Sequence, residues 1–334
     1  MSAVQESSST ARPAASELEG RLEGHRSELT AYCYRMLASP FEAEDAVQET
    51  FIRAWRSYDR FEGRAALRSW LYRIATNVCL DMLAGRERRA TPMDLGPSQA
   101  PEAANLNILP ETTWIQPIPD GLVAPEGDPA DVAVARETIR LAFVAALQHL
   151  PPRQRAVLIL CEVLRWKAAE VAELLETSVA SVNSALQRAR ATLEAGKVSA
   201  SDPAPPLDEE GRELLARYVA AFERYDIDAL TSLIHEDATQ SMPPYDLWLT
   251  GRDDIFAWWL GPGIACSGSR VIPAPAANGA PAFGQYKPSE TGEGYEPWAL
   301  QVLEISGGRI AEMTFFLETD TLFPLFGLPA RLEA

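Results

Sequence analysis

Hydrophobic residues recur with a helical period along most of the first two hundred positions. The period holds over residues 20–37, is interrupted at Ser39-Pro40, and returns over residues 42–58. A third long helix is predicted from Leu67 to about Arg88. These segments together predict an all-helical module of about seventy residues.

The helical period returns after a long interruption. Residues 90–133 are rich in proline, aspartate and small residues and have no period. Helices are then predicted over residues 134–149 and 153–164. Two more, over residues 166–175 and 179–193, are joined by a turn of three residues. This last pair predicts a helix-turn-helix.

The pattern changes beyond residue 207. Helices are predicted over residues 208–224 and 227–234, followed by the strand-like runs WALQVLEI and IAEMTFFLE with a Gly-Gly turn between them. The predicted fold is therefore multidomain, with two all-α domains, the second containing the helix-turn-helix, and a C-terminal α+β domain. The expected divisions are a disordered tail at 1–18, helical modules at 19–90 and 134–197, linkers at 91–133 and 198–207, and the α+β domain at 208–330.

One stretch of the first linker, TTWIQPIPDGLVAP at residues 112–125, is too apolar for a solvated spacer. Its three prolines exclude a regular helix. A linker of about forty residues could reach about 130 Å, more than spacing requires. We therefore expect Trp114, Ile115 and Ile118 to dock on the C-terminal domain in the free protein. Asp120 completes the predicted docking set, because with Gly121 it suits a turn.

The net charge of −17 at first argues against nucleic-acid binding, but the charge is distributed unevenly. Residues 21–90 carry +2, residues 91–131 carry −7, residues 132–197 carry +3 and residues 201–334 carry −13. The charge of the binding module matters more than that of the chain. Two mildly basic modules thus flank an acidic linker and precede an acidic domain. Electrostatic attraction makes it reasonable that the acidic domain masks the basic modules within the same chain, although salt would weaken this attraction.

The four cysteines are far apart and have no CxxC spacing, so free thiols are expected, with Cys33 and Cys79 buried, and neither disulfides nor zinc. No apolar run approaches the roughly 20 residues that cross a bilayer. The polar start MSAVQESSSTARPAAS is not a secretory signal. We expect a cytoplasmic protein without metal or cofactor.

Two blocks of sequence resemble the extracytoplasmic-function (ECF) sigma factors of the sigma-70 superfamily. One block resembles the family's fourth domain and reads PPRQRAVLILCEVLRWKAAEVAELLETSVASVNSALQRARATL. The other resembles the family's second domain and reads SPFEAEDAVQETFIRAWRSYDRFEGRAALRSWLYRIATNVCLDMLAGRERR. The blocks stand in the family's order and cover roughly residues 20–197. Farther on, ELLARYVAAFERYDIDALTSLIHEDATQSMPPYDLWLTGRDDIFAWW resembles a SnoaL-like domain, a small cone of curved sheet and helices. The arrangement is similar to the actinobacterial sigma-G-like and sigma-J-like group.

The resemblance implies a contact with core RNA polymerase. In the family, the helix that contains EAEDAVQETFIRAW docks on the clamp helices of the β′ subunit, and the fourth domain meets the β flap. The residues expected to bind polymerase are Glu44, Asp45, Gln48, Glu49 and Arg53. From the residues alone, the same face could simply be solvated.

The resemblance also implies that DRFEGRAALRSWLYRIATN faces the −10 promoter element. Arginines suit phosphates, and a loop phenylalanine suits stacking on an unpaired base. The expected −10 residues are Arg60, Phe61, Arg64, Arg68, Arg73 and Asn77. Trp70 is expected to be a core residue.

The outward side of the helix at 179–193 suits base edges and phosphates in a major groove. The expected −35 residues are Ser178, Ser181, Asn183, Ser184, Gln187, Arg188 and Arg190, with Ser178 also serving as N-cap. The alternative is an ordinary helical hairpin with a solvated face. Family members commonly have Lys or Arg where this chain has Asn183 and Ala185, so we expect the free protein to depend on polymerase to hold DNA.

The C-terminal domain has candidate acid–base residues, since some SnoaL-like proteins are cyclases or isomerases. The candidates are His235, Glu236, Asp237, Asp253 and Asp254, which could equally be a solvated helix end and a turn. A second set, Met242, Trp248, Trp258 and Trp259, could line a cavity, although core packing is their default role.

The sequence thus predicts an alternative sigma factor that binds core RNA polymerase and promoter DNA. Its SnoaL-like domain is expected to regulate it in cis, which could replace a separate anti-sigma factor. Two alternatives remain open at this point: a SnoaL-type enzyme fused to a DNA-binding sensor, and a polymerase-independent repressor.

Overall fold

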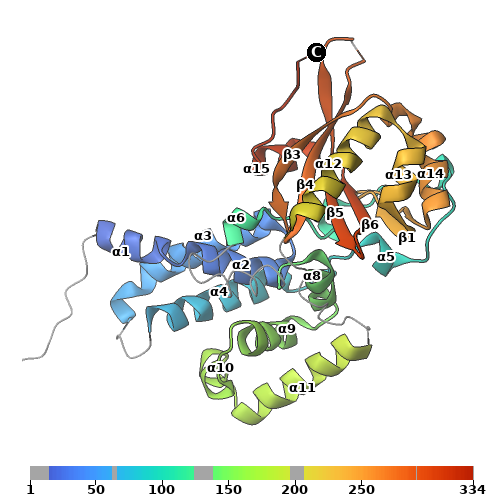
Figure 1. Ribbon diagram of the computed structural model, residues 1–334. Helices are drawn as coiled ribbons and strands as arrows, with labels where there is room; N and C mark the ends of the chain where they lie inside the picture. The colour runs from blue at the N-terminus through green and yellow to red at the C-terminus, as the bar shows by residue number, and fades with distance from the viewer. Residues whose placement is uncertain (1–14, 62–65, 124–137, 196–206, 291, 334) are drawn as a thin grey trace, which may run out of the picture.

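The chain forms three parts in the computed structural model, which describes residues 15–61, 66–123, 138–195, 207–290 and 292–333 (Figure 1). Two helical modules lie side by side below a domain built on a β-sheet. The connecting segment, residues 90–123, leaves the first module, passes along the sheet domain and returns to the first module. The linker expected at 198–207 lies outside the described residues except at its last position.

The first helical module packs α2 against α3 and α4. Ala38 ends α2 in the left-handed conformation, and Ser39 then accepts a hydrogen bond from the Glu42 backbone N–H, with Pro40 in the first turn of α3. A serine cap followed by proline is a favourable helix start. The helices are α1 (Ala15–Glu23), α2 (Arg26–Leu37), α3 (Pro40–Ser57) and α4 (Leu67–Leu83), with a 3₁₀ turn at Tyr58–Arg60.

The second helical module contains the expected helix-turn-helix. Its α9 continues into a π-helical turn at Ile159–Val163, where the chain bends toward the helix-turn-helix. The helices are α8 (Leu141–Gln148), α9 (Pro152–Leu158), α10 (Ala168–Leu174) and α11 (Val179–Ala195).

The C-terminal domain is a six-stranded sheet of order β2-β1-β6-β5-β4-β3, in which β1 and β6 are parallel and the other pairs antiparallel. The expected Gly-Gly turn joins β5 to β6, with positive φ at Gly307 and Gly308 as a tight hairpin requires. The strands are β1 (Ile234–Ser241), β2 (Trp248–Thr250), β3 (Arg270–Ala277), β4 (Ala280–Pro288), β5 (Tyr295–Ser306) and β6 (Arg309–Phe316).

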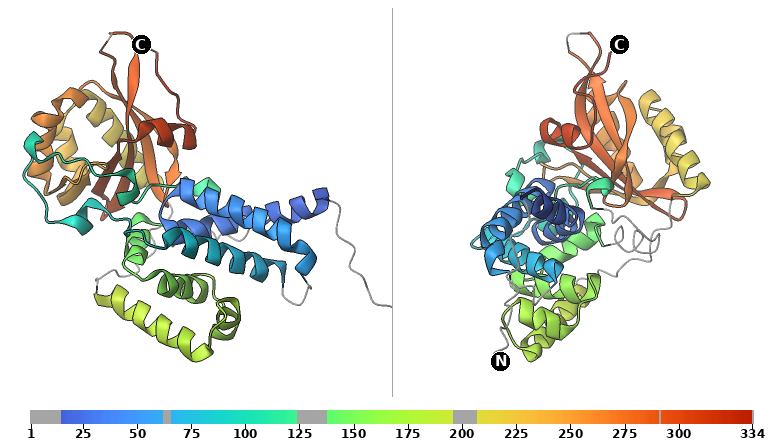
Figure 2. Two further views of the ribbon diagram at one scale, coloured as in Figure 1. Left: turned by 180° about the vertical axis from the view of Figure 1, so that it is seen from behind. Right: turned by 90° about the vertical axis from the view of Figure 1, so that its left-hand side faces the viewer.

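Helices cover both faces of this sheet, with α12 on one side and α15 on the other (Figure 2, right). The helices of the domain are α12 (Glu209–Arg224), α13 (Ile227–Leu233), α14 (Arg252–Leu260) and α15 (Thr319–Leu325), with a 3₁₀ turn at Pro262–Cys266. The prediction of two helical domains and an α+β domain is confirmed.

The hydrophobic cores divide the molecule differently from the domain boundaries. One core runs through both helical modules and includes Ile115, Ile118 and Val123 of the connecting segment. The C-terminal domain has two further cores, one on each face of the sheet, and Phe41 and Leu141 of the helical modules pack against one of them. The helical modules are therefore closed on each other, with the connecting segment packed into their joint core.

Several expected elements differ from those observed. The helix expected at 20–37 is broken near Gly24, and the long third helix ends at Leu83. The connecting segment, expected to be irregular, contains short helices at Pro92–Leu95, Ala103–Asn105, Glu111–Thr113 and Asp120–Val123, the last labelled α6. The run His235-Glu236-Asp237 was expected at a helix end but lies in strand β1, because α13 ends at Leu233.

Candidate polymerase and promoter surfaces

The polar face of α3 is open to solvent. Asp45 and Gln48 are exposed, and Glu44, Glu49 and Arg53 are partly exposed on the same side of the helix. Arg53 donates to Glu49 Oε1 at 2.7 Å and to Asp81 Oδ2 at 3.1 Å. Surface ion pairs of this kind contribute little to stability, so the face is available to a partner at small cost.

The predicted −10 residues are arranged around an aromatic cluster. Phe61 and Trp70 have ring centroids 5.0 Å apart, and Tyr58 contacts both rings. Asn77 is exposed on α4 and Arg73 is half-buried. The side chain of Arg60 and all of Arg64 lie outside the described residues.

Arg68, another predicted −10 residue, contacts the second helical module, although its side chain remains 44% exposed. Its guanidinium lies 5.2 Å from the Tyr72 ring centroid and 5.7 Å from that of Trp166, which precedes α10. The rings of Tyr72 and Trp166 are themselves 5.1 Å apart, and Arg68 Nε donates to Glu28 Oε2 at 2.7 Å. One edge of the predicted −10 surface is thus occupied by the neighbouring module.

The helix-turn-helix exposes every residue predicted to read the −35 element. Ser178 caps α11, with its Oγ accepting from the Ser181 backbone N–H at 3.1 Å, and the two hydroxyls are 2.9 Å apart. Arg190 forms an ion pair with Glu162, whereas Arg188 and Gln187 project freely from α11 into solvent. Val182 and Ala189 bury the opposite side of the helix. The polar set therefore forms one accessible stripe.

Two buried arginines join the helical modules. Arg155 donates to the Met36 carbonyl across the interface and to Gln148 Oε1 at 2.5 Å, and Arg35 donates to Thr138 Oγ1 at 2.7 Å. Burial lowers the pKa of each guanidinium to about 10, so both are charged at neutral pH. Their acceptors are mainly carbonyl groups, and Arg155 Nε has no acceptor among the described residues. The closed interface therefore carries a desolvation cost.

The connecting segment is fastened to the first helical module by Gln116. Its backbone N–H donates to the Ala38 carbonyl at 3.0 Å, its carbonyl accepts from Tyr34 OH at 2.8 Å, and its side chain accepts from Ser39 Oγ at 2.5 Å. Arg89 donates to the Trp114 carbonyl at 2.6 Å. These bonds position the buried side chains of Trp114 and Ile115.

Asn278, in the turn between β3 and β4, connects all three parts of the molecule. It is fully buried, its Oδ1 accepts from the Ile118 N–H at 2.9 Å, and its N–H donates to the Ile118 carbonyl at 3.1 Å. Its Nδ2 donates to Tyr34 OH at 2.7 Å in the first module and to the Ile139 carbonyl at 2.5 Å before α8. Asp120 Oδ1 also accepts a hydrogen bond from the Gly279 N–H at 2.7 Å.

This geometry differs from the expected docking in one respect. The side chains of Ile115 and Ile118 pack in the helical core, not in either core of the C-terminal domain. At this point of the segment, the contact with the C-terminal domain is made instead by the main chain of Ile118 and the side chain of Asp120. Asn278-Gly279 is recognisable in the sequence as a hairpin turn, but no sequence signal assigns it an interdomain contact.

A charged pair links the C-terminal domain to the second helical module. Arg140 Nη2 lies 2.6 Å from Glu304 Oε2 on β5. Burial, and secondarily the neighbouring Glu304, raise the pKa of Glu312 on β6 to about 7, with Arg140 opposing the rise. Burial also raises the pKa of Glu304.

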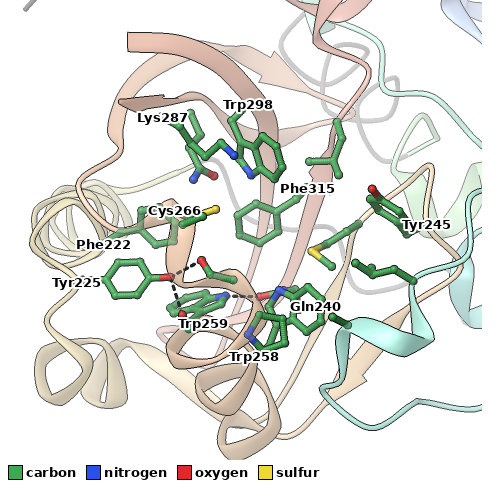
Figure 3. A pocket seen from close by; sticks show the side chains of 18 residues that line it. Phe222, Tyr225, Gln240, Tyr245, Trp258, Trp259, Cys266, Lys287, Trp298 and Phe315 are labelled. Carbon is green, nitrogen blue, oxygen red and sulfur yellow. Dashed lines mark hydrogen bonds between the residues drawn. The ribbon is translucent and has the colours of Figure 1, made fainter. Parts of the chain in front are cut away.

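The C-terminal domain encloses a cavity of about 210 Å³ between the sheet and α12 and α14 (Figure 3). Three of the four residues considered as possible cavity lining, Met242, Trp258 and Trp259, do line it, whereas Trp248 donates from Nε1 to the Gly96 carbonyl at 2.9 Å. The acid–base candidates His235, Glu236, Asp237, Asp253 and Asp254 are all absent from its lining. Burial raises the pKa of the lining thiol of Cys266, which keeps it neutral.

Similar sequences decide the family. Residues 22–89 match sigma-70 region 2, residues 140–193 match sigma-70 region 4, and residues 215–313 match a SnoaL-like domain. The ECF RNA polymerase sigma factor SigG of Mycobacterium tuberculosis H37Rv is 46% identical over 319 residues, which cover 95% of this chain and 85% of the relative. The chain belongs to the ECF RNA polymerase sigma factors.

Further similarities agree with this. SigJ of the same organism is 33% identical to this sigma factor over 219 residues, covering 65% of this chain and 62% of the relative. The crystal structure of Mycobacterium tuberculosis SigJ shares the fold, with a TM-score of 0.57 at 23% identity over 95% of this chain and 100% of that chain. Like other sigma factors, the protein binds core RNA polymerase and promoter DNA and directs transcription initiation.

The described residues contain neither a membrane-spanning helix nor a metal-binding cluster. No helix there is long and apolar enough to span a bilayer. Within the same residues, no group of three or more histidines, cysteines and acidic residues could hold a metal ion.

Proposed function

We propose that this sigma factor rests in the closed arrangement and that its SnoaL-like domain holds it there in cis. Asn278 carries this proposal, because one buried side chain bonds the connecting segment, the first helical module and the chain entering the second. Buried hydrogen bonds between separate parts of a chain resist their separation. The restraint acts within the same polypeptide, in place of a separate anti-sigma factor.

The contact of Arg68 with Trp166 supports the same proposal. An arginine that packs beside two rings and pairs with Glu28 must give up these contacts to turn fully toward a phosphate. Promoter binding would then require the helical modules to separate. The buried and incompletely bonded Arg155 favours that separation once polymerase supplies compensating contacts.

In the active state, the exposed face of α3 would bind the β′ clamp helices, the second helical module would meet the β flap, and α11 would read the −35 element. The aromatic cluster around Phe61 would face the −10 element, with Arg68, Arg73 and Asn77 beside it and the Arg60 and Arg64 positions contributing phosphate contacts. The protein would act in the cytoplasm, where chromosome and polymerase are found. The C-terminal cavity lacks a lining carboxylate or imidazole among the described residues, which favours a regulatory over a catalytic role.

Charge reversal on α3 tests the polymerase contact. Asp45→Arg combined with Gln48→Arg should abolish run-off transcription by core polymerase and reduce polymerase binding at least tenfold. The matched control is Asp253→Arg, an exposed aspartate on α14 in the C-terminal domain, which should leave both unchanged. Equal binding by the α3 variant and the control would refute the assigned face.

Substitutions on α11 test promoter reading. Gln187→Ala should relax preference at one position of the −35 element, at a cost of about 1–3 kcal/mol for the preferred base. Arg188→Ala should instead weaken all promoters alike and reduce the salt dependence of binding by about one ion. Glu194→Ala, near the end of the same helix, is the control. The assignment fails if transcription from −35 variants responds identically to all three substitutions.

A further inference from the structure

The cavity of the C-terminal domain is built to hold a flat apolar molecule. Its walls include three indole rings, those of Trp258, Trp259 and Trp298, and the rings of Phe222 and Phe315 (Figure 3). A cavity of about 150 Å³ in a protein interior holds one benzene ring. A volume of about 210 Å³ therefore has room for one or two fused rings.

One cation faces this otherwise neutral space. Lys287 on β4 places its Nζ 3.3 Å from the centroid of the Trp298 ring, and it is the sole charged residue in the lining among the residues that the structure describes. Gln240 in the lining adds an amide, whose Oε1 accepts from Trp259 Nε1 at 2.7 Å. Both groups suit an anionic or strongly accepting oxygen on the ligand.

The connecting segment closes one side of the same cavity. Ala103 and Leu106 belong to the lining although they lie between the two helical modules in sequence. The next residues are bonded to the C-terminal domain, with the Leu109 N–H donating to the Pro244 carbonyl at 3.0 Å and the Asp246 N–H to the Asn107 carbonyl at 3.1 Å. A molecule in the cavity therefore touches the segment that the proposed restraint depends on.

We propose that the cavity binds a planar ligand of one or two rings bearing a carboxylate or phenolate oxygen, and that the bound ligand stabilises the docked connecting segment. Contacts with Leu106 and Ala103 exist only while the segment is docked, so the ligand binds the docked state more tightly and shifts the population toward it. The consequence for transcription, stronger inhibition, rests on the proposed closed resting state. The binding site itself does not.

Calorimetry on the full-length chain with 2-naphthoate as probe tests the site. We expect one saturable site per chain, with 2-naphthylmethylamine, a cation of the same shape, binding at least tenfold more weakly. Lys287→Met should remove this preference for the anion. The control Arg270→Met takes a cation from the adjacent strand, where it stacks on Tyr295 outside the lining, and should retain the preference. Absence of saturable naphthoate binding up to millimolar concentration, or unchanged selectivity in Lys287→Met, would overturn the proposal.

Amide hydrogen exchange tests the link to the connecting segment. At a naphthoate concentration of 100 times Kd, local opening at Leu109 should fall by up to about 100-fold. Leu106→Ser, which removes apolar contact at the mouth, should weaken naphthoate binding by roughly tenfold and reduce this protection. Naphthoate binding without slower exchange at Leu109 would overturn the coupling to the connecting segment but not the binding site itself. Neither assay contains polymerase, so a failure of the closed resting state in transcription is distinguishable from a failure here.

Discussion

The substitution Asn278→Gly should remove the interdomain hydrogen bonds of this side chain and leave the other properties of the turn unchanged. Asn278 has φ of +54°, a conformation that glycine adopts without strain, and its own N–H bond to the Ile118 carbonyl would persist. The substitution removes three side-chain bonds, to the Ile118 N–H, Tyr34 OH and the Ile139 carbonyl. The effect is therefore confined to what holds the three parts together.

The expected size follows from these bonds. Each contributes about 1 kcal/mol net, and a buried donor or acceptor left without a partner costs about 1–3 kcal/mol. The substitution should therefore lower the free energy needed to undock the connecting segment by about 3–5 kcal/mol. Since about 1.4 kcal/mol is a factor of ten, the undocked population should increase by roughly 100- to 4,000-fold.

Hydrogen exchange at the Gln116 and Ile118 amides is the direct assay, supported by run-off transcription. Both amides should exchange faster in Asn278→Gly, and basal transcription with core polymerase should rise. Asn107→Gly is the control, because it removes one exposed side-chain bond of 3.2 Å to Asp246 at the other end of the segment and should cost less than about 1 kcal/mol. If the two variants exchange alike at Ile118, Asn278 does not hold the closed arrangement.

Two further predictions concern the other contacts between the parts. Glu312 has a pKa of about 7 in the folded protein instead of 4.5. It therefore contributes to folding stability only when protonated. This contribution is present below about pH 4.5 and is lost as pH rises through 7. Glu312→Gln should thus stabilise the protein by up to about 3 kcal/mol in denaturant unfolding at pH 8 and by little at pH 4.5, and equal gains at both would contradict the cause given. Trp166→Ala should release Arg68 from its ring contact and raise non-specific DNA binding by the free protein, measured by fluorescence anisotropy, while Trp298→Ala should not; equal affinities would refute this role of the contact.

The sequence predicted the fold class because local patterns carry it. Helical period, the short turn before Ser178 and the Gly-Gly hairpin each depend on neighbours in the chain, and all three features are observed. The contact between Arg68 and Trp166 was not predictable in the same way, since it depends on how two modules pack. The apolar residues at 114–118 correctly indicated burial, but their pattern could not show which domain's core they enter.

Sequence reasoning about candidate sites succeeded or failed for a similar reason. A polar stripe on α11 is visible as spacing alone. The importance of Asn278 is invisible, because an Asn-Gly turn looks the same whether its side chain meets water or three other segments. For the same reason, acidic residues near 235 and 253 looked chemically suitable while lying away from the cavity.

The position of Asn278 along the chain sets an order of events during synthesis. Both DNA-reading modules are complete at Ala195, whereas the turn that fastens them follows about 80 residues later. At about 5–20 residues per second, a ribosome needs roughly 4–16 seconds for that stretch. Under the proposed restraint in cis, each newly made molecule would therefore pass once through a brief period in which its promoter-reading parts exist without that restraint. Thereafter every copy would carry its own restraint in fixed one-to-one proportion, independent of the supply of a second gene product.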